Sequence, residues 1–317
     1  MTPLDDAPLD VLDAYRTCEF ATLGRDGTPA AWPTAVRRKE DGTLLLTTSL
    51  AFAQKALNVR RDSRVGLLFS DATGSGLTDA PQIFVGGRAE CPDQIVTGPE
   101  GAEDYWQMLF ERQPHSQAYV SAPLRWTMDW YYLRLLITVT PEQVIVRPPL
   151  VASAPGTATA ADKAGGAGGA GTLPGAAQLA PYDSAVLSAR DASGAPVLAR
   201  TRPVPTAAGY AVELPDDCRA EPGPAALLVH RHDDRMNNMH NALVRGRLEA
   251  SGDGLLLVPE KVVQPMGTGR ASDALGVMRR TKHATARYLE RRGLPRPEVR
   301  WNEFRALAAA ARKKNAS

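Results

Sequence analysis

The sequence predicts a mainly β protein with peripheral helices, an α+β class arranged as two tandem antiparallel barrels. Three observations support this prediction. Short apolar runs are separated by turn residues, a low-complexity segment lies near the middle, and segments of the second half repeat segments of the first half in the same order. With 317 residues, the chain is long enough for two hydrophobic cores.

Short strands and tight turns follow one another through the first half. A strand is expected at 19–24, and the turn at 25–27 leads into an extended run at 29–38. Asp41-Gly42 is a hairpin signal ahead of a strand at 43–48. Further strands are predicted at 64–70, 82–90, 131–137 and 143–147, and helices at 9–15 and 100–112.

Residues 151–180 differ in composition from what precedes them. They are rich in Ala, Gly, Pro and Thr, with few large apolar side chains, so they bury too little surface to become ordered. We therefore predict a first barrel at 1–150, a flexible linker at 151–180, and a diverged second barrel with C-terminal helices at 181–317. Those helices are expected at 272–289 and 301–314, on either side of a Gly/Pro-rich break.

An internal repeat is predicted because three segments of the first half recur in order. The matching pairs are 20–27 with 182–194, 66–69 with 225–229, and 85–90 with 244–249.

Charge and cysteine content restrict the class of protein. The net charge is +2 with Lys and Arg spread along the chain, which implies no strong attraction to nucleic acid or membrane. Cys18, Cys91 and Cys218 lie far apart without metal-ligand spacing, as is typical of a reducing compartment. The acidic first residues lack the apolar segment of a secretory signal, and no apolar run approaches the roughly 20 residues that span a bilayer. We therefore expect a cytoplasmic protein.

An anion site is predicted where the strand at 43–48 runs into a helix. Hydroxyl side chains occupy 47–49, and apolar residues recur at helical spacing from Leu50 onward. The first backbone N–H groups of a helix lack partners and attract anions, with Ser49 as a candidate N-cap. Because helical side chains lean toward the helix N-terminus, Lys55 is expected to bring its ammonium over that end. The alternative is a capped surface helix with a solvated lysine.

The second half lacks this anion site. Residues 211–218 stand where the first half has 47–61, without a lysine-bearing helix and with two added acids, Asp216 and Asp217. Because those carboxylates would repel phosphate, we expect one anion site in the chain.

Residues 15–93 resemble the pyridoxamine 5′-phosphate oxidase-like, FMN-binding split-barrel superfamily. The resemblance rests on the order of its parts: the strand at 20–23, Asp26-Gly27, Pro33, Asp41-Gly42, the strand end at 47–49, Lys55 and Asn58, residues 61–65, and the strand at 85–90. It implies two tandem six-stranded split β-barrels of FMN-binding type, with flavin at their interface. One chain would then carry both barrels as a fused pseudo-dimer, and a further homodimer stays open.

The resemblance also implies cofactor-binding residues. In such proteins the helix lysine and the strand-end hydroxyls hold the FMN phosphate, here Lys55 with Thr47, Thr48 and Ser49. The isoalloxazine lies along the preceding strand, here Pro33, Thr34, Ala35 and Val36. Gln54 is expected to cap the site and Gln82 to reach the ring. Trp32 departs from the family pattern, and it either stacks on a ring or fills core.

The function implied is that of an FMN-dependent oxidoreductase that moves hydride or electrons to or from a small organic substrate. Because flavin itself carries the hydride chemistry, we assign no catalytic side chain. The alternatives are a deazaflavin-dependent reductase in the same groove, and a flavin- or haem-binding protein without turnover.

Two further groups of residues have alternative interpretations. His230, His232 and His240 form either a metal or haem site or, as we favour, a polar surface between the barrels; we assign no metal ligand. The aromatic cluster of Trp126, Trp130, Tyr131 and Tyr132 is interpreted as core, with a substrate-pocket wall as the alternative.

Overall fold

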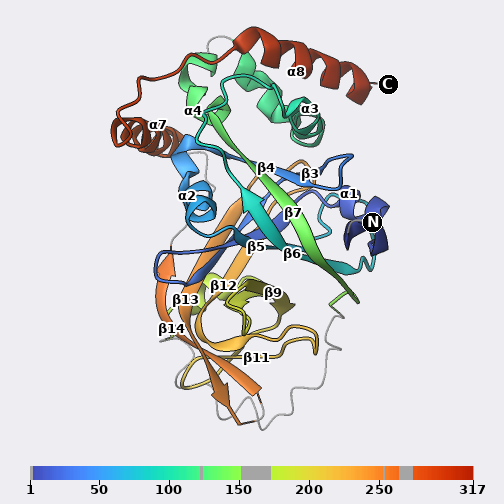
Figure 1. Cartoon of the computed structure of the whole chain (residues 1–317), viewed down its shortest axis with the longest axis vertical. Helices are drawn as coiled ribbons and strands as arrows, with labels where there is room; N and C mark the ends of the chain where they lie inside the picture. The colour runs from blue at the N-terminus through green and yellow to red at the C-terminus, as the bar shows by residue number, and fades with distance from the viewer. Residues whose placement is uncertain (1–2, 122–123, 151–172, 253, 264–273, 317) are drawn as a thin grey trace.

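The computed structural model describes residues 3–121, 124–150, 173–252, 254–263 and 274–316. Within these ranges the chain forms two curled antiparallel sheets of seven strands each, and Figure 1 shows one next to the other. The prediction of a mainly β fold with two tandem barrels is confirmed.

The first sheet closes on itself through a single bent strand. Its order is β2-β1-β5-β6-β7-β4-β3, so β2 and β3 lie at opposite ends of the order although only Ala35 separates them along the chain. The six strands per barrel that the resemblance implies count these two segments as one. The strands are β1 (Cys18–Leu23), β2 (Pro29–Thr34), β3 (Val36–Arg38), β4 (Leu44–Ser49), β5 (Arg64–Phe69), β6 (Gln82–Glu90) and β7 (Arg134–Arg147).

The second sheet has the same connectivity as the first. Its order is β10-β11-β14-β13-β12-β8-β9, and each strand takes the place of the strand seven positions earlier. The internal repeat predicted from three short segments therefore extends through the whole sheet. The strands are β8 (Ala185–Arg190), β9 (Pro196–Thr201), β10 (Val204–Pro205), β11 (Tyr210–Val212), β12 (Glu221–Arg231), β13 (His240–Ser251) and β14 (Gly254–Val263).

A β-bulge recurs at equivalent glycines in both sheets. The pairing of β6 with β7 shifts at Gly87, and that of β13 with β14 shifts at Gly246. A Cβ on Gly87 would lie 2.3 Å from the Thr140 carbonyl oxygen, and one on Gly246 would lie 2.0 Å from that of Val258. Only glycine fits such an approach, which explains why Gly-Arg recurs at these positions.

The same bulge corrects one sequence expectation. The strands predicted at 131–137 and 143–147 are a single 14-residue strand, β7, interrupted only by the shift opposite Gly87. Pro141 looks like a strand breaker in the sequence, but it lies at the bulge, where proline is tolerated.

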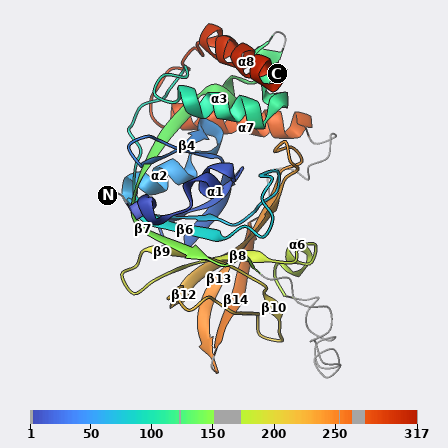
Figure 2. The same ribbon diagram turned by 90° about the vertical axis from the view of Figure 1, so that its right-hand side faces the viewer.

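Helices cover the first sheet at the end remote from the second. Figure 2 shows α3, α7 and α8 together on that side. The C-terminal helices follow the second barrel in sequence, yet Tyr288, Leu289 and Phe304 belong to the core of the first. The described helices are η1 (Pro3–Asp6), α1 (Leu9–Ala14), η2 (Leu50–Phe52), α2 (Gln54–Arg61), α3 (Glu103–Arg112), η3 (Pro114–Val120), η4 (Leu124–Thr127), α4 (Asp129–Tyr132), α6 (Ala176–Leu179), α7 (Ala274–Glu290) and α8 (Trp301–Ala316).

Most of the predicted linker, at 151–172, lies outside the described residues. Its last residues form α6, where Leu179 is buried against the second core and the Tyr210 hydroxyl donates to the Pro174 carbonyl. The second barrel therefore begins before the predicted linker ends.

The two sheets meet through a small apolar cluster. Leu68 and Phe84 of the first sheet belong to the same buried cluster as Leu198 and Leu228 of the second. Burial of this cluster stabilises the junction in the usual way for apolar surface. None of the helices in the described ranges is both long and apolar enough to cross a membrane.

Candidate functional site

The strand end that was predicted to bind an anion is buried. Thr47, Thr48 and Ser49 are the last residues of β4, and each is at most 3% exposed. Side chains alternate along a strand, so Thr47 and Ser49 share one face while Thr48 points to the other. The Thr48 hydroxyl donates to the Phe52 carbonyl and ties β4 to η2.

Lys55 is also buried. It is the second residue of α2, which begins after the short η2 turn, and Ser49 precedes that turn without making a side-chain cap. Its Nζ lies 5.8 Å from the centre of the Trp32 ring. Burial lowers the pKa of Lys55 to about 8, and the Arg134 guanidinium adds to this while the Cys18 thiol opposes it. The alternative of a solvated surface lysine is therefore wrong.

Arg134 completes the group and was not predicted from the sequence. It is the first residue of β7 and pairs in register with Ser49, so the two side chains extend from the same face of the sheet. Its guanidinium lies 4.4 Å from the centre of the Tyr131 ring and 5.2 Å from that of Trp106. We call Thr47, Ser49, Lys55 and Arg134 the cationic cradle.

Polar atoms of the cradle lack partners. Among the described residues, Thr47 Oγ1, Ser49 Oγ and Arg134 Nε are buried and make no hydrogen bond. Thr47 lies close enough to Tyr105 to influence the pKa of that phenol, but the contact does not reach hydrogen-bond geometry. Buried polar groups are normally satisfied, so three orphaned atoms together indicate a place for a ligand.

An aromatic cover closes the cradle on one side. Trp106 of α3 stacks on Tyr132, with ring centres 5.2 Å apart, and Phe304 of α8 packs edge-on against it at 4.8 Å. Tyr131 donates to Gln113, which in turn donates to the Met236 carbonyl of the second barrel. The aromatic cluster predicted as core is thus core for Tyr132 and cradle wall for Tyr131, whereas Trp126 is exposed.

The charge of the cradle is unusual for this protein. Two arginines are buried among the described residues, Arg134 and Arg147, at opposite ends of β7. Arg147 binds Asp217 through Nε at 2.8 Å and Nη2 at 2.7 Å. Arg134 has no carboxylate partner within the described part of the chain, and neither does Lys55. Leaving a buried cation without a counter-ion costs several kcal/mol, roughly, so the cradle is suited to an anion from outside the protein.

At the equivalent position after its strand β11, the second barrel carries an aspartate, Asp217. Asp217 follows β11, the counterpart of β4, and its carboxylate neutralises Arg147 of the first barrel. That Asp216 and Asp217 would repel phosphate stays a prediction; the structure shows that Asp217 already has Arg147 as its partner.

The other predicted site residues lie at varying places. Ala35 and Val36 are buried in the first core, beside Thr34, while Pro33 pairs with Glu19 on the face toward the second barrel. Gln54 is exposed and donates to Asn58, so it extends away from the cradle. Gln82 donates to the Pro148 carbonyl at the far end of β6. The structure therefore links Ser49 to Arg134 through strand register and brings Lys55 within electrostatic reach of Arg134, but it does not join Gln54 or Gln82 to this group.

The histidines lie at the junction of the barrels. His230 Nε2 is 2.7 Å from Glu19 Oε1, and Arg200 binds the same carboxylate at 2.7 Å. His232 faces Thr17 and Asp71. His240 is separate and stacks on Tyr182. Within the described ranges no cluster of side chains has the composition of a metal site.

The cradle presents hydrogen-bond donors of the kinds that a phosphate group accepts. A phosphate dianion accepts hydrogen bonds from hydroxyl, ammonium and guanidinium groups, and the cradle holds all three types, with unused donors on Thr47, Ser49 and Arg134. The sequence contained one signal for Arg134: it interrupts the apolar run at 130–139, where a charge is unexpected.

Comparison with known proteins gives only distant likenesses. No family model matches the sequence, and no curated protein matches it either. Solved structures that align with it include the protein Atu2129 of Agrobacterium tumefaciens, at 23% identity over 46% of this chain and 60% of that one, with a TM-score of 0.31. A putative pyridoxamine 5′-phosphate oxidase of Listeria innocua aligns at 18% identity over 45% and 97%, with a TM-score of 0.31. Protein Rv2991 of Mycobacterium tuberculosis aligns at 23% identity over 48% and 92%, with a TM-score of 0.34.

At these identities and scores the alignments say nothing of function, and they cover less than two thirds of the Agrobacterium chain. The fold rests instead on the strand order, which occurs twice with the same bulge. The chain is therefore a tandem split-barrel protein, with two copies of one antiparallel barrel in a single polypeptide.

Proposed function

We propose that this protein binds FMN, with the phosphate in the cationic cradle, and that it is a flavin-dependent oxidoreductase acting on a small organic substrate. One observation carries the proposal: Lys55 and Arg134 are buried beside two orphaned hydroxyls, without a carboxylate partner in the described ranges. The resemblance of residues 15–93 to FMN-binding split barrels supports flavin as the molecule that brings the phosphate.

Each cradle residue has a separate task. Lys55 and Arg134 neutralise the phosphate charge, and Thr47 and Ser49 donate hydrogen bonds that no other described group takes up. The segment 33–36 passes from β2 to β3 beside β4, so its backbone is the expected neighbour of the isoalloxazine. Bound flavin would supply hydride transfer, and the protein supplies position, charge and exclusion of water.

One cofactor per chain follows from the asymmetry of the barrels. Arg147 is bound by Asp217, so an incoming phosphate would have to displace a carboxylate that is already in place. Titration calorimetry with FMN should therefore give one site per chain.

The proposal is tested by the absorption spectrum of the purified protein and by its titration with FMN. Copurified flavin, or uptake of one added FMN, supports the proposal. A haem spectrum, or no uptake of FMN, contradicts it. If the protein took up a deazaflavin coenzyme in place of FMN, the cradle would still be the phosphate site, but the identity of the cofactor would be wrong. Turnover is then tested by following reoxidation of the reduced flavin with candidate substrates.

A further inference from the structure

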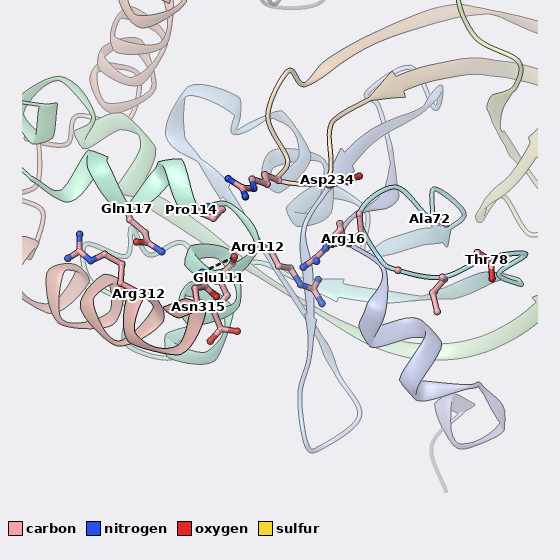
Figure 3. A pocket seen from close by; sticks show the side chains of 14 residues that line it. Arg16, Ala72, Thr78, Glu111, Arg112, Pro114, Gln117, Asp234, Arg312 and Asn315 are labelled. Atoms are coloured by element: carbon pink, nitrogen blue, oxygen red, sulfur yellow. Dashed lines mark hydrogen bonds between the residues drawn. The ribbon is translucent and has the colours of Figure 1, made fainter. Parts of the chain in front are cut away.

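A cavity lies apart from the cradle, between the helices of the first barrel and a loop of the second. Its volume is about 930 Å³, within the range of small-molecule sites. Figure 3 shows that its walls come from the β5–β6 loop, α3, α8 and the β12–β13 loop. The cofactor proposal assigns no role to this cavity.

The base of the cavity holds two arginines side by side. Arg112 donates to the carbonyl oxygens of Tyr15 and Asp13, and Arg16 donates to that of Gly74. These main-chain contacts fix the two guanidinium groups without neutralising them, and no ion pair of either occurs within the described ranges. Burial, followed by the charges of Arg16 and Arg37, lowers the pKa of Arg112 to about 10, so Arg112 remains a cation at neutral pH.

The rim adds further positive charge. Arg235 of the second barrel and Arg312 of α8 line the cavity, and both are exposed. The carboxylates in the lining are Asp234 and Glu111, and the latter already binds Lys314 at 3.0 Å. Four guanidinium groups therefore face two carboxylates, one of which is engaged.

The cavity walls are held at a fixed separation. Gly74 has a φ of 69°, and a Cβ at this position would lie 2.7 Å from the Asp234 carbonyl oxygen. The two loops thus touch backbone to backbone, and both barrels contribute to one cavity. Met236, in the same loop of the second barrel, is buried in the first core and anchors the contact.

We propose that this cavity binds a small organic anion through a carboxylate or phosphate group held by Arg16 and Arg112. Planar guanidinium groups bind such anions in bidentate geometry, and these two are oriented before the ligand arrives. Arg235 and Arg312 attract the anion at the rim. This site is additional to the cradle and stands whether or not FMN occupies the cradle.

Titration calorimetry with citrate and with inorganic phosphate tests the site, on the protein as purified and again in the presence of added FMN, so that the test holds even if FMN does not bind. We expect at least one probe to bind with one site per chain, and the tighter probe identifies the preferred anionic group. In the double variant Arg235→Gln/Arg312→Gln the affinity should fall roughly tenfold or more, since two charged contacts are lost from exposed positions that leave the fold intact.

Two controls separate this site from general charge and from the cradle. Arg305→Gln removes a cation from the same helix, α8, outside the cavity lining, and it should leave probe affinity unchanged. Lys55→Gln should also leave citrate affinity unchanged. Failure of both probes to bind, or an equal loss in either control, would overturn the proposal.

Discussion

Ser49 and Arg134 face one another across the β4–β7 ladder as a register pair, yet neither satisfies the other. The Ser49 hydroxyl and Arg134 Nε are both without a hydrogen bond among the described residues. A folded protein rarely leaves two neighbouring buried donors unused. The proposed phosphate would accept hydrogen bonds from both groups.

Removing the orphaned hydroxyls should weaken FMN binding without lowering the stability of the protein. Thr47→Val and Ser49→Ala delete groups that have no partner in the unliganded protein, so the free energy of unfolding should stay level or rise by up to about 1 kcal/mol. FMN affinity should fall by roughly 0.5–1.5 kcal/mol for each hydroxyl. Urea denaturation and FMN titration measure the two effects.

Thr48→Val is the control, because its hydroxyl donates to the Phe52 carbonyl. It should lower stability by about 1 kcal/mol and leave FMN affinity nearly unchanged. Equal effects of Thr47→Val and Thr48→Val on both measurements would contradict the assignment.

Substitution by Met should change the unfolding free energy in opposite directions at the two buried arginines of β7. Arg134→Met removes a buried cation without a counter-ion, which outweighs the loss of its contacts with Tyr131 and Trp106, so unfolding free energy should rise by roughly 1–2 kcal/mol. Arg147→Met leaves Asp217 unpaired and should lower it by roughly 2–4 kcal/mol. Thermal and urea unfolding of the two variants decide this. If both variants were destabilised to a similar extent, the charge of Arg134 would already be neutralised within the unliganded protein, and the prediction would be wrong.

The sequence was sufficient for the fold because turn residues, strand lengths and the repeat all agree. The hairpins at Asp26-Gly27 and Asp41-Gly42 join β1 to β2 and β3 to β4, as expected. The continuity of β7 was missed because Pro141 reads as a breaker unless the bulge at Gly87 is known. That bulge depends on pairing with Gly87 of β6, which is far from Pro141 in the sequence.

The site was only partly predictable for a related reason. Thr47, Ser49 and Lys55 are close in sequence, so local pattern was enough to bring them together. Arg134 reaches them only through pairing of β7 with β4, a long-range contact that composition does not reveal. Gln54 was expected to cap the site on the basis of the resemblance, but its side chain donates to Asn58 one turn along the same helix.

The junction between the barrels should weaken in acid. Burial raises the pKa of Glu19, but Arg200 and His230 more than offset it, so the pKa lies below that of a free glutamate. The pKa of Asp71 is also lowered despite its burial, chiefly by His230. Groups of this kind stabilise the fold above their unfolded pKa, and the stabilisation is lost as pH falls through the folded pKa.

Urea denaturation over a pH series from 7 to about 3, which extends well below the pKa of roughly 4.3 of an unfolded glutamate, should show a larger loss of stability for the wild type than for Glu19→Gln. Glu19→Gln is less stable at neutral pH because Arg200 loses its partner. An identical pH dependence in both proteins would show that Glu19 does not titrate in this range.

FMN binding should weaken in alkali. The pKa of Lys55 is about 8 in the unliganded protein, so above that pH the amine must take up a proton to bind phosphate. Affinity should therefore fall by up to about tenfold per pH unit above 8. Lys55→Arg keeps its charge in this range and should lose the dependence. Fluorescence titrations between neutral and alkaline pH check this, and a flat wild-type profile would contradict it.

The most direct test compares FMN with riboflavin, which differ only in the phosphate, by calorimetry on the wild type and on Lys55→Ala. We expect the wild type to bind FMN more tightly than riboflavin. Lys55→Ala should weaken FMN by roughly 1.5–3 kcal/mol and leave riboflavin nearly unchanged. FMN affinity that is unchanged in Lys55→Ala, or an equal loss for both ligands, would contradict the cradle as the phosphate site.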